Sequence, residues 1–229
     1  MVIKGLQKLT LLDFPEKIAA TIFTGGCNFR CPFCHNASLV VPDRFAETIP
    51  ERDVMEFLRS RVGRLGGVCI SGGEPTLQPD LAMFIRRVRE LGFAVKLDTN
   101  GYRPDVLRSL IDEGLLDYVA MDIKNSPEKY GATVGLPEFD ISPILESIDI
   151  LKGSGVPFEF RTTVIRELHT EEDIRAIGEW LSFAERFYLQ SFTDSGDLLG
   201  EGLSAHSIDT MEHFLKILKE SVPNAALRS

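Results

Sequence analysis

A strand-like run followed at once by three cysteines is the most informative part of this chain: KIAATIFTGGCNFRCPFCHN, residues 17–36. Residues 17–23 are mostly apolar or β-branched, as expected for a strand of a parallel sheet that is covered on both faces. Cys27, Cys31 and Cys34 follow directly, at C-x3-C-x2-C spacing. The stretch therefore predicts a buried strand whose carboxyl end carries a group of thiols.

The alternation of strand and helix continues along the whole chain. Amphipathic helical runs, one opened by Thr170 with Asp173 and another by Ser207, separate the apolar runs. Strict alternation of this kind implies a parallel sheet with right-handed crossovers. It does not by itself distinguish an open doubly wound sheet from a barrel or partial barrel. The further predicted strands are residues 67–71, 94–97, 118–123, 157–165 and 186–192.

The organisation of the chain predicts a single domain. No linker or change of composition divides residues 1–229, and the predicted core covers about residues 17–220. The N-terminal segment 1–16 and residues 193–206 lie outside the repeat, and we interpret both as surface connections, with a lid or a partner-binding loop as the alternative. Residues 35–42, after the cysteines, are predicted to form a loop.

Charge and composition exclude several classes of protein. The 229 residues include 25 basic and 34 acidic side chains, a formal net charge of −9. An acidic chain is poorly suited to a nucleic-acid backbone, so we expect no nucleic-acid partner. No run approaches the ~20 apolar residues of a membrane span, and the N-terminus is too polar for a signal peptide. We therefore expect a cytoplasmic protein with no membrane partner, whose cysteines act as ligands or reactive groups rather than disulfides.

Three thiols within eight residues suit one compact inorganic group. Thiolates bind iron–sulfur clusters or zinc, and three of them would leave one iron of a four-iron cluster open to a substrate or cofactor. The alternatives are structural zinc, a thioredoxin-like pair formed by Cys31 and Cys34, and chance clustering. The fourth cysteine, Cys69, lies in an apolar strand and is expected to be a buried thiol.

Other chemistry-bearing residues follow the next strands, and in parallel α/β folds such strand ends converge. The motifs are SGGEPT at 71–76, DTNG at 98–101 and DIKN at 122–125. The two glycines of the first motif allow close backbone approach. An Asn-Gly turn is the alternative interpretation of the second motif. Asp122 and Lys124 project from the same side of their strand, and a structural ion pair is the alternative interpretation for them.

Together these motifs resemble the radical S-adenosylmethionine superfamily. The cysteine motif has an aromatic residue, Phe33, before its last cysteine, and a GGE motif follows on the next strand. The resemblance implies an α/β fold with parallel strands, a partial (β/α)6 barrel. It also implies one [4Fe–4S] cluster held by Cys27, Cys31 and Cys34, with S-adenosylmethionine on the fourth iron. The residues expected to approach the methionyl group are Gly72, Gly73 and Glu74.

DTNG, D-x-K and the Cys34-His35-Asn36 run narrow the resemblance to the glycyl-radical-enzyme activating enzymes. It implies a monovalent cation near Asp98 and Asp122. The residues that it places at the cofactor are Phe33, Asn36, Asp98, Thr99, Asn100, Asp122, Lys124 and, by a looser match, Arg161. The N-terminal stretch 5–36 is most similar to activating proteins of anaerobic ribonucleoside-triphosphate reductase, although residues 13–16 replace the D-G-P-G segment of other activases.

This resemblance implies an oxidoreductase that forms a glycyl radical on the reductase, with flavodoxin or ferredoxin as electron donor. Alternatives are an activase of another glycyl radical enzyme of the pyruvate formate-lyase type, and a radical enzyme acting on a small molecule. A zinc or iron–sulfur binding module is the non-enzymatic alternative. His169, His206 and His213 lack ligand-like spacing, and each is expected to be a surface or a capped residue.

Overall fold

The computed structural model describes residues 1–41, 47–136 and 138–228. The chain divides into two compact units. The first contains residues 1–28, 38–120 and 143–157, and the second contains residues 29–37, 121–142 and 158–229. None of the helices in the described ranges has both the length and the apolar character needed to cross a bilayer.

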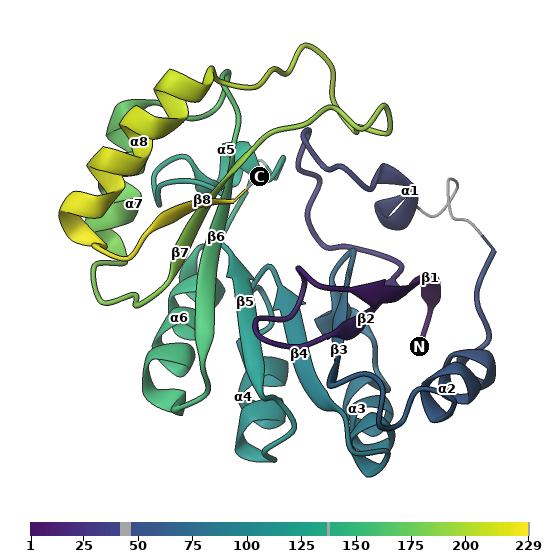
Figure 1. Ribbon diagram of the computed structural model, residues 1–229. Helices are drawn as coiled ribbons and strands as arrows, with labels where there is room; N and C mark the ends of the chain where they lie inside the picture. Colours follow the sequence, from purple (N-terminus) through teal and green to yellow (C-terminus); the bar gives the residue numbers. More distant parts are fainter. Residues whose placement is uncertain (42–46, 137, 229) are drawn as a thin grey trace. The chain divides into compact units, whose positions relative to one another are not determined.

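Strands and helices alternate through both units (Figure 1). The strands are β1 (Ile3–Thr10), β2 (Ala19–Thr24), β3 (Gly67–Gly72), β4 (Ala94–Thr99), β5 (Tyr118–Asp122), β6 (Phe158–Val164), β7 (Phe187–Ser191) and β8 (Ala226–Arg228). The helices are α1 (Ala37–Val40), α2 (Glu51–Arg59), the 3-10 turn η2 (Pro75–Leu77), α3 (Leu81–Glu90), α4 (Pro104–Asp112), α5 (Tyr130–Thr133), α6 (Ser142–Ser154), α7 (Glu171–Trp180) and α8 (Ile208–Ser221).

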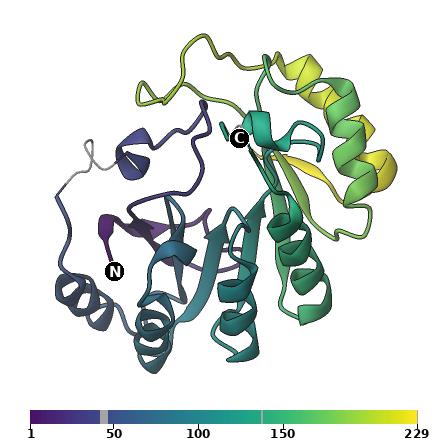
Figure 2. The same cartoon turned by 180° about the vertical axis from the view of Figure 1, so that it is seen from behind.

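In the first unit the sheet order follows the chain, from β1 to β4. β2, β3 and β4 are parallel, and their register sets Thr21 beside Cys69 and Cys69 beside Lys96. The helices α3 and α4 lie over one face of this part of the sheet, as the view from behind shows (Figure 2). Residues on both faces of these strands are buried, which explains why their sequences are mostly apolar.

In the second unit β6, β7 and β8 form a parallel set in that order. Helices α7 and α8 pack against each other where Gly178 leaves room for Leu218. The Thr170 and Asp173 pair forms the capping box of α7, and Ser207 accepts the Thr210 N–H at the start of α8, as their positions in the sequence predict.

The predicted α/β fold with parallel strands is confirmed, and all six predicted strands are present. Two expectations about the remaining segments are wrong, and one further strand, β8, was not predicted. Residues 3–10 form strand β1, antiparallel to β2, and residues 226–228 form β8. Residues 37–40 are helical rather than part of a loop, while Pro42 lies outside the described residues. β1 was not predicted from the sequence because only its two end residues are buried, so its sequence shows no alternation of apolar and polar residues.

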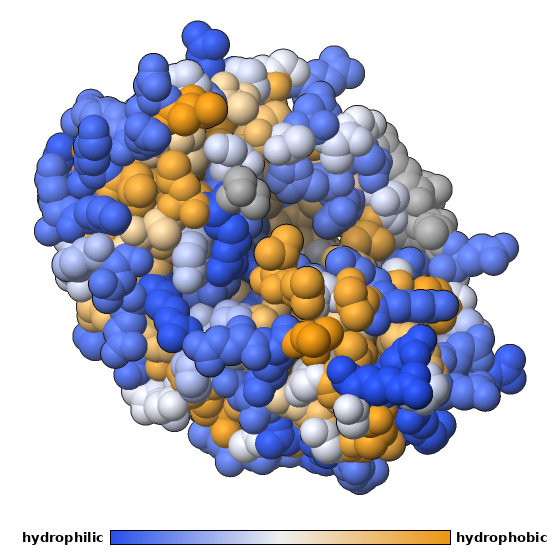
Figure 3. All heavy atoms as spheres, in the orientation of Figure 1, coloured by the Kyte–Doolittle hydropathy of each residue, from blue (hydrophilic) through white to orange (hydrophobic). Residues whose placement is uncertain are grey.

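The end of β1 and the segment after it expose apolar side chains to solvent. The exposed fractions of Leu9, Leu11 and Leu12 are 60, 67 and 81%. Figure 3 shows apolar side chains gathered over this part of the surface. Glu16, which follows, has a φ of +62° and is the non-glycine residue with positive φ in the described part of the chain. A patch of this kind is typical of a surface that binds a protein partner.

Candidate active site

In the first unit the two glycines of the SGGEPT motif pack directly against the chain that leads to Cys27. Gly73 N donates to Thr24 O at 2.9 Å, and Glu74 N donates to Gly26 O at 2.8 Å. A Cβ added to Gly73 would lie 2.0 Å from Gly26 O, and one added to Gly72 would lie 2.3 Å from Thr24 N. The predicted close backbone approach therefore exists here, and the partner is the chain's own cysteine-bearing segment.

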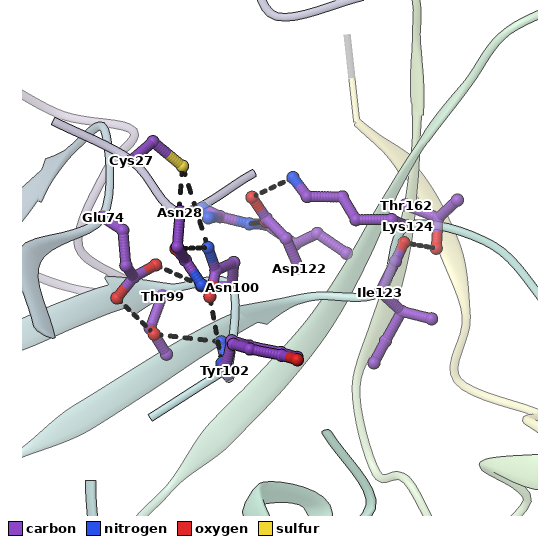
Figure 4. A network of polar contacts seen from close by, with 12 residues as sticks. Cys27, Asn28, Glu74, Thr99, Asn100, Tyr102, Asp122, Ile123, Lys124 and Thr162 are labelled. Carbon is purple, nitrogen blue, oxygen red and sulfur yellow. Dashed lines mark hydrogen bonds and ion pairs between the residues drawn. The ribbon is translucent and has the colours of Figure 1, made fainter. Parts of the chain in front are cut away.

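Glu74 is fully buried and collects hydrogen bonds from two motifs. Its Oε1 accepts from Thr76 N at 3.1 Å and from Thr99 Oγ1 at 2.8 Å, and its Oε2 accepts from Asn100 N at 2.7 Å. Burial raises the pKa of this carboxyl, and the bonds from Thr76, Asn100 and Thr99 oppose that shift. Glu74 thus joins the SGGEPT and DTNG motifs, as Figure 4 shows.

Asn100 connects the same network to the first cysteine. Its Nδ2 lies 2.8 Å from Asn28 Oδ1 and 3.8 Å from Cys27 Sγ (Figure 4). Asn28 was not singled out by sequence analysis, although a small polar residue directly after Cys27 was a usable signal. Asn28 Nδ2 is buried and has no hydrogen-bond partner within the described residues. Such an unsatisfied donor is what an anionic sulfide or carboxylate ligand would pair with.

Asp98 is held by a lysine that sequence analysis also missed. Lys96 is 1% exposed, its Nζ forms an ion pair with Asp98, and it lies 3.9 Å from Cys69 Sγ. Cys69 is completely buried, as predicted. The sequence did contain a signal for this pair, since Lys96 is the single charged residue in the apolar run AVKL. A lysine buried in such a strand needs an anionic partner nearby.

In the second unit, Asp122, Lys124 and Arg161 form one cluster. Lys124 Nζ lies 3.0 Å from Asp122 Oδ2, and Arg161 Nε lies 2.9 Å from Asp122 Oδ1. Burial opposes ionisation of Asp122, but Arg161 and Lys124 outweigh it and hold the pKa of the carboxyl well below its ordinary value. The pKa of Lys124 is correspondingly raised, because the charge of Asp122 outweighs burial. The D-x-K pair predicted from the sequence is therefore a charged triad with Arg161.

The other two cysteines lie near this triad, in the same unit. Cys34 N donates to Cys31 O at 3.1 Å, so the two residues form a tight turn, with Phe33 buried between them. Burial raises the pKa of the Cys34 thiol, while the Asn36 main chain and the charge of Lys124 act in the opposite direction. The side chain of Asn36 is exposed.

Residues 192–200 contact the outside of this cysteine turn. His35 stacks on Phe192 with ring centroids 5.6 Å apart, and Ser195 Oγ donates to His35 O at 2.9 Å. Gly200 N donates to Pro32 O at 2.8 Å. The segment interpreted as a surface connection therefore also supports the loop that carries Cys31 and Cys34.

We expect Gly200→Ala to loosen the cysteine turn, since the new Cβ would lie 2.6 Å from Pro32 Cβ. Overpacking of this size costs about 1–3 kcal/mol. The iron bound per chain after reconstitution should fall and its release to a chelator should accelerate. Gly153→Ala in α6, where an added Cβ meets nothing within 4 Å, is the matched control. Equal iron retention in the two variants would show that residues 192–200 do not support the turn.

His169 positions the backbone of Lys124 and is a capped residue rather than a surface one, the second of the two placements expected from the sequence. It is 1% exposed, its Nε2–H donates to Lys124 O at 2.9 Å, and its Nδ1 accepts from Ile165 N at 3.1 Å. These two contacts require the neutral ring. Burial lowers the pKa of His169 below its ordinary value of 6.5, against the opposing effect of the two hydrogen bonds.

A pH dependence of stability follows from the burial of His169. Below pH 6.5 the unfolded chain takes up a proton that the folded chain resists, so the free energy of unfolding should fall as the pH decreases. The slope from this group is at most about 1.4 kcal/mol per pH unit. His169→Gln should lower stability at pH 8 and flatten the slope just below pH 6.5. Denaturant titrations of both proteins at several pH values measure this, and an unchanged slope in the variant would contradict it.

Each unit thus brings together its own share of the predicted residues. The first joins Cys27, Glu74, Thr99 and Asn100, and the second joins Cys31, Cys34, Asp122, Lys124 and Arg161. The donor set fits an iron–sulfur cluster, because the cysteines are thiols and the first of them has an amide donor, Asn100 Nδ2, beside it. Binding of one cluster by all three sulfurs stays a prediction.

Comparisons with known proteins identify the class to which this fold and these motifs belong. The family model described as the radical SAM superfamily matches residues 21–181, and the chain belongs to this superfamily. It is therefore a radical S-adenosylmethionine enzyme, and membership implies a [4Fe–4S] cluster and S-adenosylmethionine as cofactors.

The relatives of this chain include activating enzymes. A protein of Methanocaldococcus jannaschii, named as a candidate glycyl-radical enzyme activating enzyme, is 35% identical over 99% of this chain and 95% of its own length. The pyruvate formate-lyase-activating enzyme of Clostridium pasteurianum is 28% identical over 76% of this chain and 74% of its own. The chain is homologous to the glycyl-radical-enzyme activating enzymes.

A solved structure shows the same fold. SuiB of Streptococcus suis, crystallised with its precursor peptide SuiA, matches 91% of this chain with a TM-score of 0.73 and 14% sequence identity. The present chain spans 48% of that protein. At this level of identity the likeness shows the fold alone, and it confirms the fold class predicted from the sequence.

Proposed function

We propose that this protein is a cytoplasmic activase that cleaves S-adenosylmethionine reductively and generates a glycyl radical on anaerobic ribonucleoside-triphosphate reductase. The observation that carries the radical part is the network in which buried Glu74 joins the GGE and TNG motifs beside Cys27. The activase part is supported by the similarity of nearly the whole chain to the Methanocaldococcus activating enzyme. The choice of reductase rests on the resemblance of residues 5–36.

Cys27, Cys31 and Cys34 would hold the cluster through their thiolates. When bound, the cluster would supply the one-electron reduction that cleaves S-adenosylmethionine and allows a hydrogen atom to be removed from the partner's glycine, with flavodoxin or ferredoxin as the electron donor. Phe33 packs in the cysteine turn and shields it from water. The exposed Asn36 lies at the end of that turn, where it is available to a ligand.

The charged triad suits the methionyl end of the cofactor. Lys124 and Arg161 both contact the carboxylate of Asp122, so two cationic side chains lie together here. A methionyl carboxylate would be attracted to cations of this kind. A monovalent cation near Asp98 and Asp122, which the resemblance to the activating enzymes implies, stays a prediction. Gly72, Gly73 and Thr99 would shape the site through their backbone.

A protein partner accounts for the exposed apolar side chains of the first unit. Leu9, Leu11 and Leu12 are more than half exposed, which a monomeric enzyme acting on a small molecule does not require. The double variant Leu11→Ser and Leu12→Ser should therefore reduce radical transfer to the partner and leave cleavage of S-adenosylmethionine intact. Ile208→Ser, which changes an equally exposed apolar residue on α8, is the matched control.

The test is formation of a glycyl radical in a purified partner. The reduced, reconstituted protein is mixed with S-adenosylmethionine and anaerobic ribonucleoside-triphosphate reductase, and the glycyl doublet is recorded by electron paramagnetic resonance. Pyruvate formate-lyase and a sample without partner are the comparisons. A doublet that forms only with pyruvate formate-lyase would show that the proposed partner is wrong and that the protein activates an enzyme of the pyruvate formate-lyase type. Absence of a doublet with either protein, while a small metabolite supports turnover, would overturn the activase assignment.

A further inference from the structure

The side-chain amide of Asn100 faces the sulfur of Cys27. Asn100 Nδ2 carries two hydrogens, and its two acceptors are Asn28 Oδ1 at 2.8 Å and Cys27 Sγ at 3.8 Å. The orientation of the amide follows from its other end, where Tyr102 N donates to Asn100 Oδ1 at 3.0 Å. Because a backbone N–H requires an acceptor, this contact identifies the oxygen and leaves the nitrogen directed at the sulfur.

The backbone of Asn100 is held as firmly as its side chain. Glu74 Oε2 accepts from Asn100 N at 2.7 Å, and Glu74 Oε1 accepts from Thr99 Oγ1 at 2.8 Å. Thr99 Oγ1 in turn accepts from Gly101 N at 3.1 Å, and Ser147 Oγ donates to Gly101 O at 2.6 Å. Glu74 and Asn100 are both buried, so these bonds are shielded from competing water.

We propose that Asn100 is a positioning residue that donates an N–H···S hydrogen bond to Cys27 and thereby raises the reduction potential of the cluster. The inference rests on the proposed function, specifically on Cys27 as a cluster ligand. Iron binding removes the thiol proton, which makes the sulfur a charged and stronger acceptor. Reduction adds negative charge to the cluster and its sulfurs, so a donor at the sulfur stabilises the reduced state more than the oxidised state.

This assigns the DTNG and GGE motifs a role apart from contact with S-adenosylmethionine. Asn100 acts on the cluster through a cysteine sulfur, and Glu74 acts through Asn100. The fully buried carboxylate of Glu74 already accepts several hydrogen bonds from the chain, which suits a residue that holds its neighbours in place.

The deciding variants are Asn100→Asp and Asn100→Ala. Aspartate is isosteric and still accepts from Tyr102 N, but an ionised carboxylate has no hydrogen to donate to sulfur. Alanine loses both contacts. With the reconstituted clusters titrated anaerobically and followed by electron paramagnetic resonance, both variants should have lower potentials than the parent protein. At a fixed potential the ratio of reduced to oxidised cluster should fall on the order of threefold to tenfold, where tenfold equals 59 mV for a one-electron couple.

A second buried asparagine provides the matched control. Asn125 is completely buried, its Nδ2 donates to Thr133 Oγ1 and Leu168 O, and its Oδ1 accepts from Ser126 N. Asn125→Asp therefore places the same chemical change in a similar turn without a sulfur acceptor, and it should leave the cluster potential unchanged. In addition, 15N-labelled parent protein should show hyperfine coupling between the reduced cluster and a side-chain amide that Asn100→Asp lacks.

The outcomes separate this inference from the proposed function. If Asn100→Asp keeps the parent potential, Asn100 only shapes the turn and the inference is wrong. If Asn100→Asp assembles no cluster, Asn100→Ala is used instead, and an unchanged reduction potential in Asn100→Ala would show that the inference is wrong. If Cys27→Ala keeps a complete cluster, the ligand assignment itself fails. Loss of the cluster in Cys27→Ala together with unchanged potentials in both Asn100 variants overturns the inference alone.

Discussion

Replacement of Cys27, Cys31 or Cys34 with alanine is expected to abolish the iron–sulfur cluster and all cleavage of S-adenosylmethionine. Each of these residues is proposed to supply one of three thiolates. The sequence has one further cysteine, Cys69, and it is buried in β3, so it is not expected to replace a lost ligand. Loss of an outer hydrogen-bond partner of a metal ligand already costs about 10–100-fold in affinity or activity, so loss of a ligand should exceed that. Iron and sulfide per chain and the yield of 5′-deoxyadenosine measure the effect.

Cys69→Ala is the control for this series. Cys69 is completely buried in β3, with its sulfur 3.9 Å from Lys96 Nζ, so its replacement should cost stability of about 1 kcal/mol and leave the cluster intact. A cluster that is lost in Cys69→Ala and retained in one of the other three variants would refute the ligand assignment.

Gly73→Ala is expected to have the next largest effect. The added Cβ would lie 2.0 Å from Gly26 O, which is a backbone atom that no side-chain rotation can move. The GGE segment and the segment leading to Cys27 would have to separate, which breaks the bond from Glu74 N to Gly26 O. We expect a loss of roughly 3 kcal/mol or more of stability and loss of S-adenosylmethionine binding. Thermal unfolding and equilibrium binding to the reconstituted protein measure the two effects.

Gly153→Ala is again the matched control for this change. Gly153 lies inside α6, where an added Cβ meets nothing within 4 Å. Alanine should stabilise this helix by about 0.5–1 kcal/mol, because it restricts the unfolded chain and favours the helix. Comparable losses in both variants would mean that the contact between Gly73 and Gly26 does not matter for the site.

Much of the fold could be predicted from the sequence because its signals are local. The apolar runs, the capping box of Thr170 with Asp173 and the N-cap Ser207 all act within a few residues of their own position. β1 could not be found in this way, because its pairing with β2 supplies the stabilisation that its own polar sequence lacks. The choice between a surface and a capped position for His169 could not be made for the same reason, since its burial depends on contacts with Lys124 and Ile165.

The sequence by itself determined the chemistry of this protein: three thiols at a fixed spacing, the GGE, DTNG and D-x-K motifs, and their order on successive strand ends. Only the tertiary structure decided which of these groups meet. The amide of Asn100 reaches Cys27 across 73 residues of chain, and Glu74 reaches Asn100 across 26. Hydrogen bonds between such distant residues depend on strand register and on glycines that let backbones approach, and neither leaves a local pattern in the sequence.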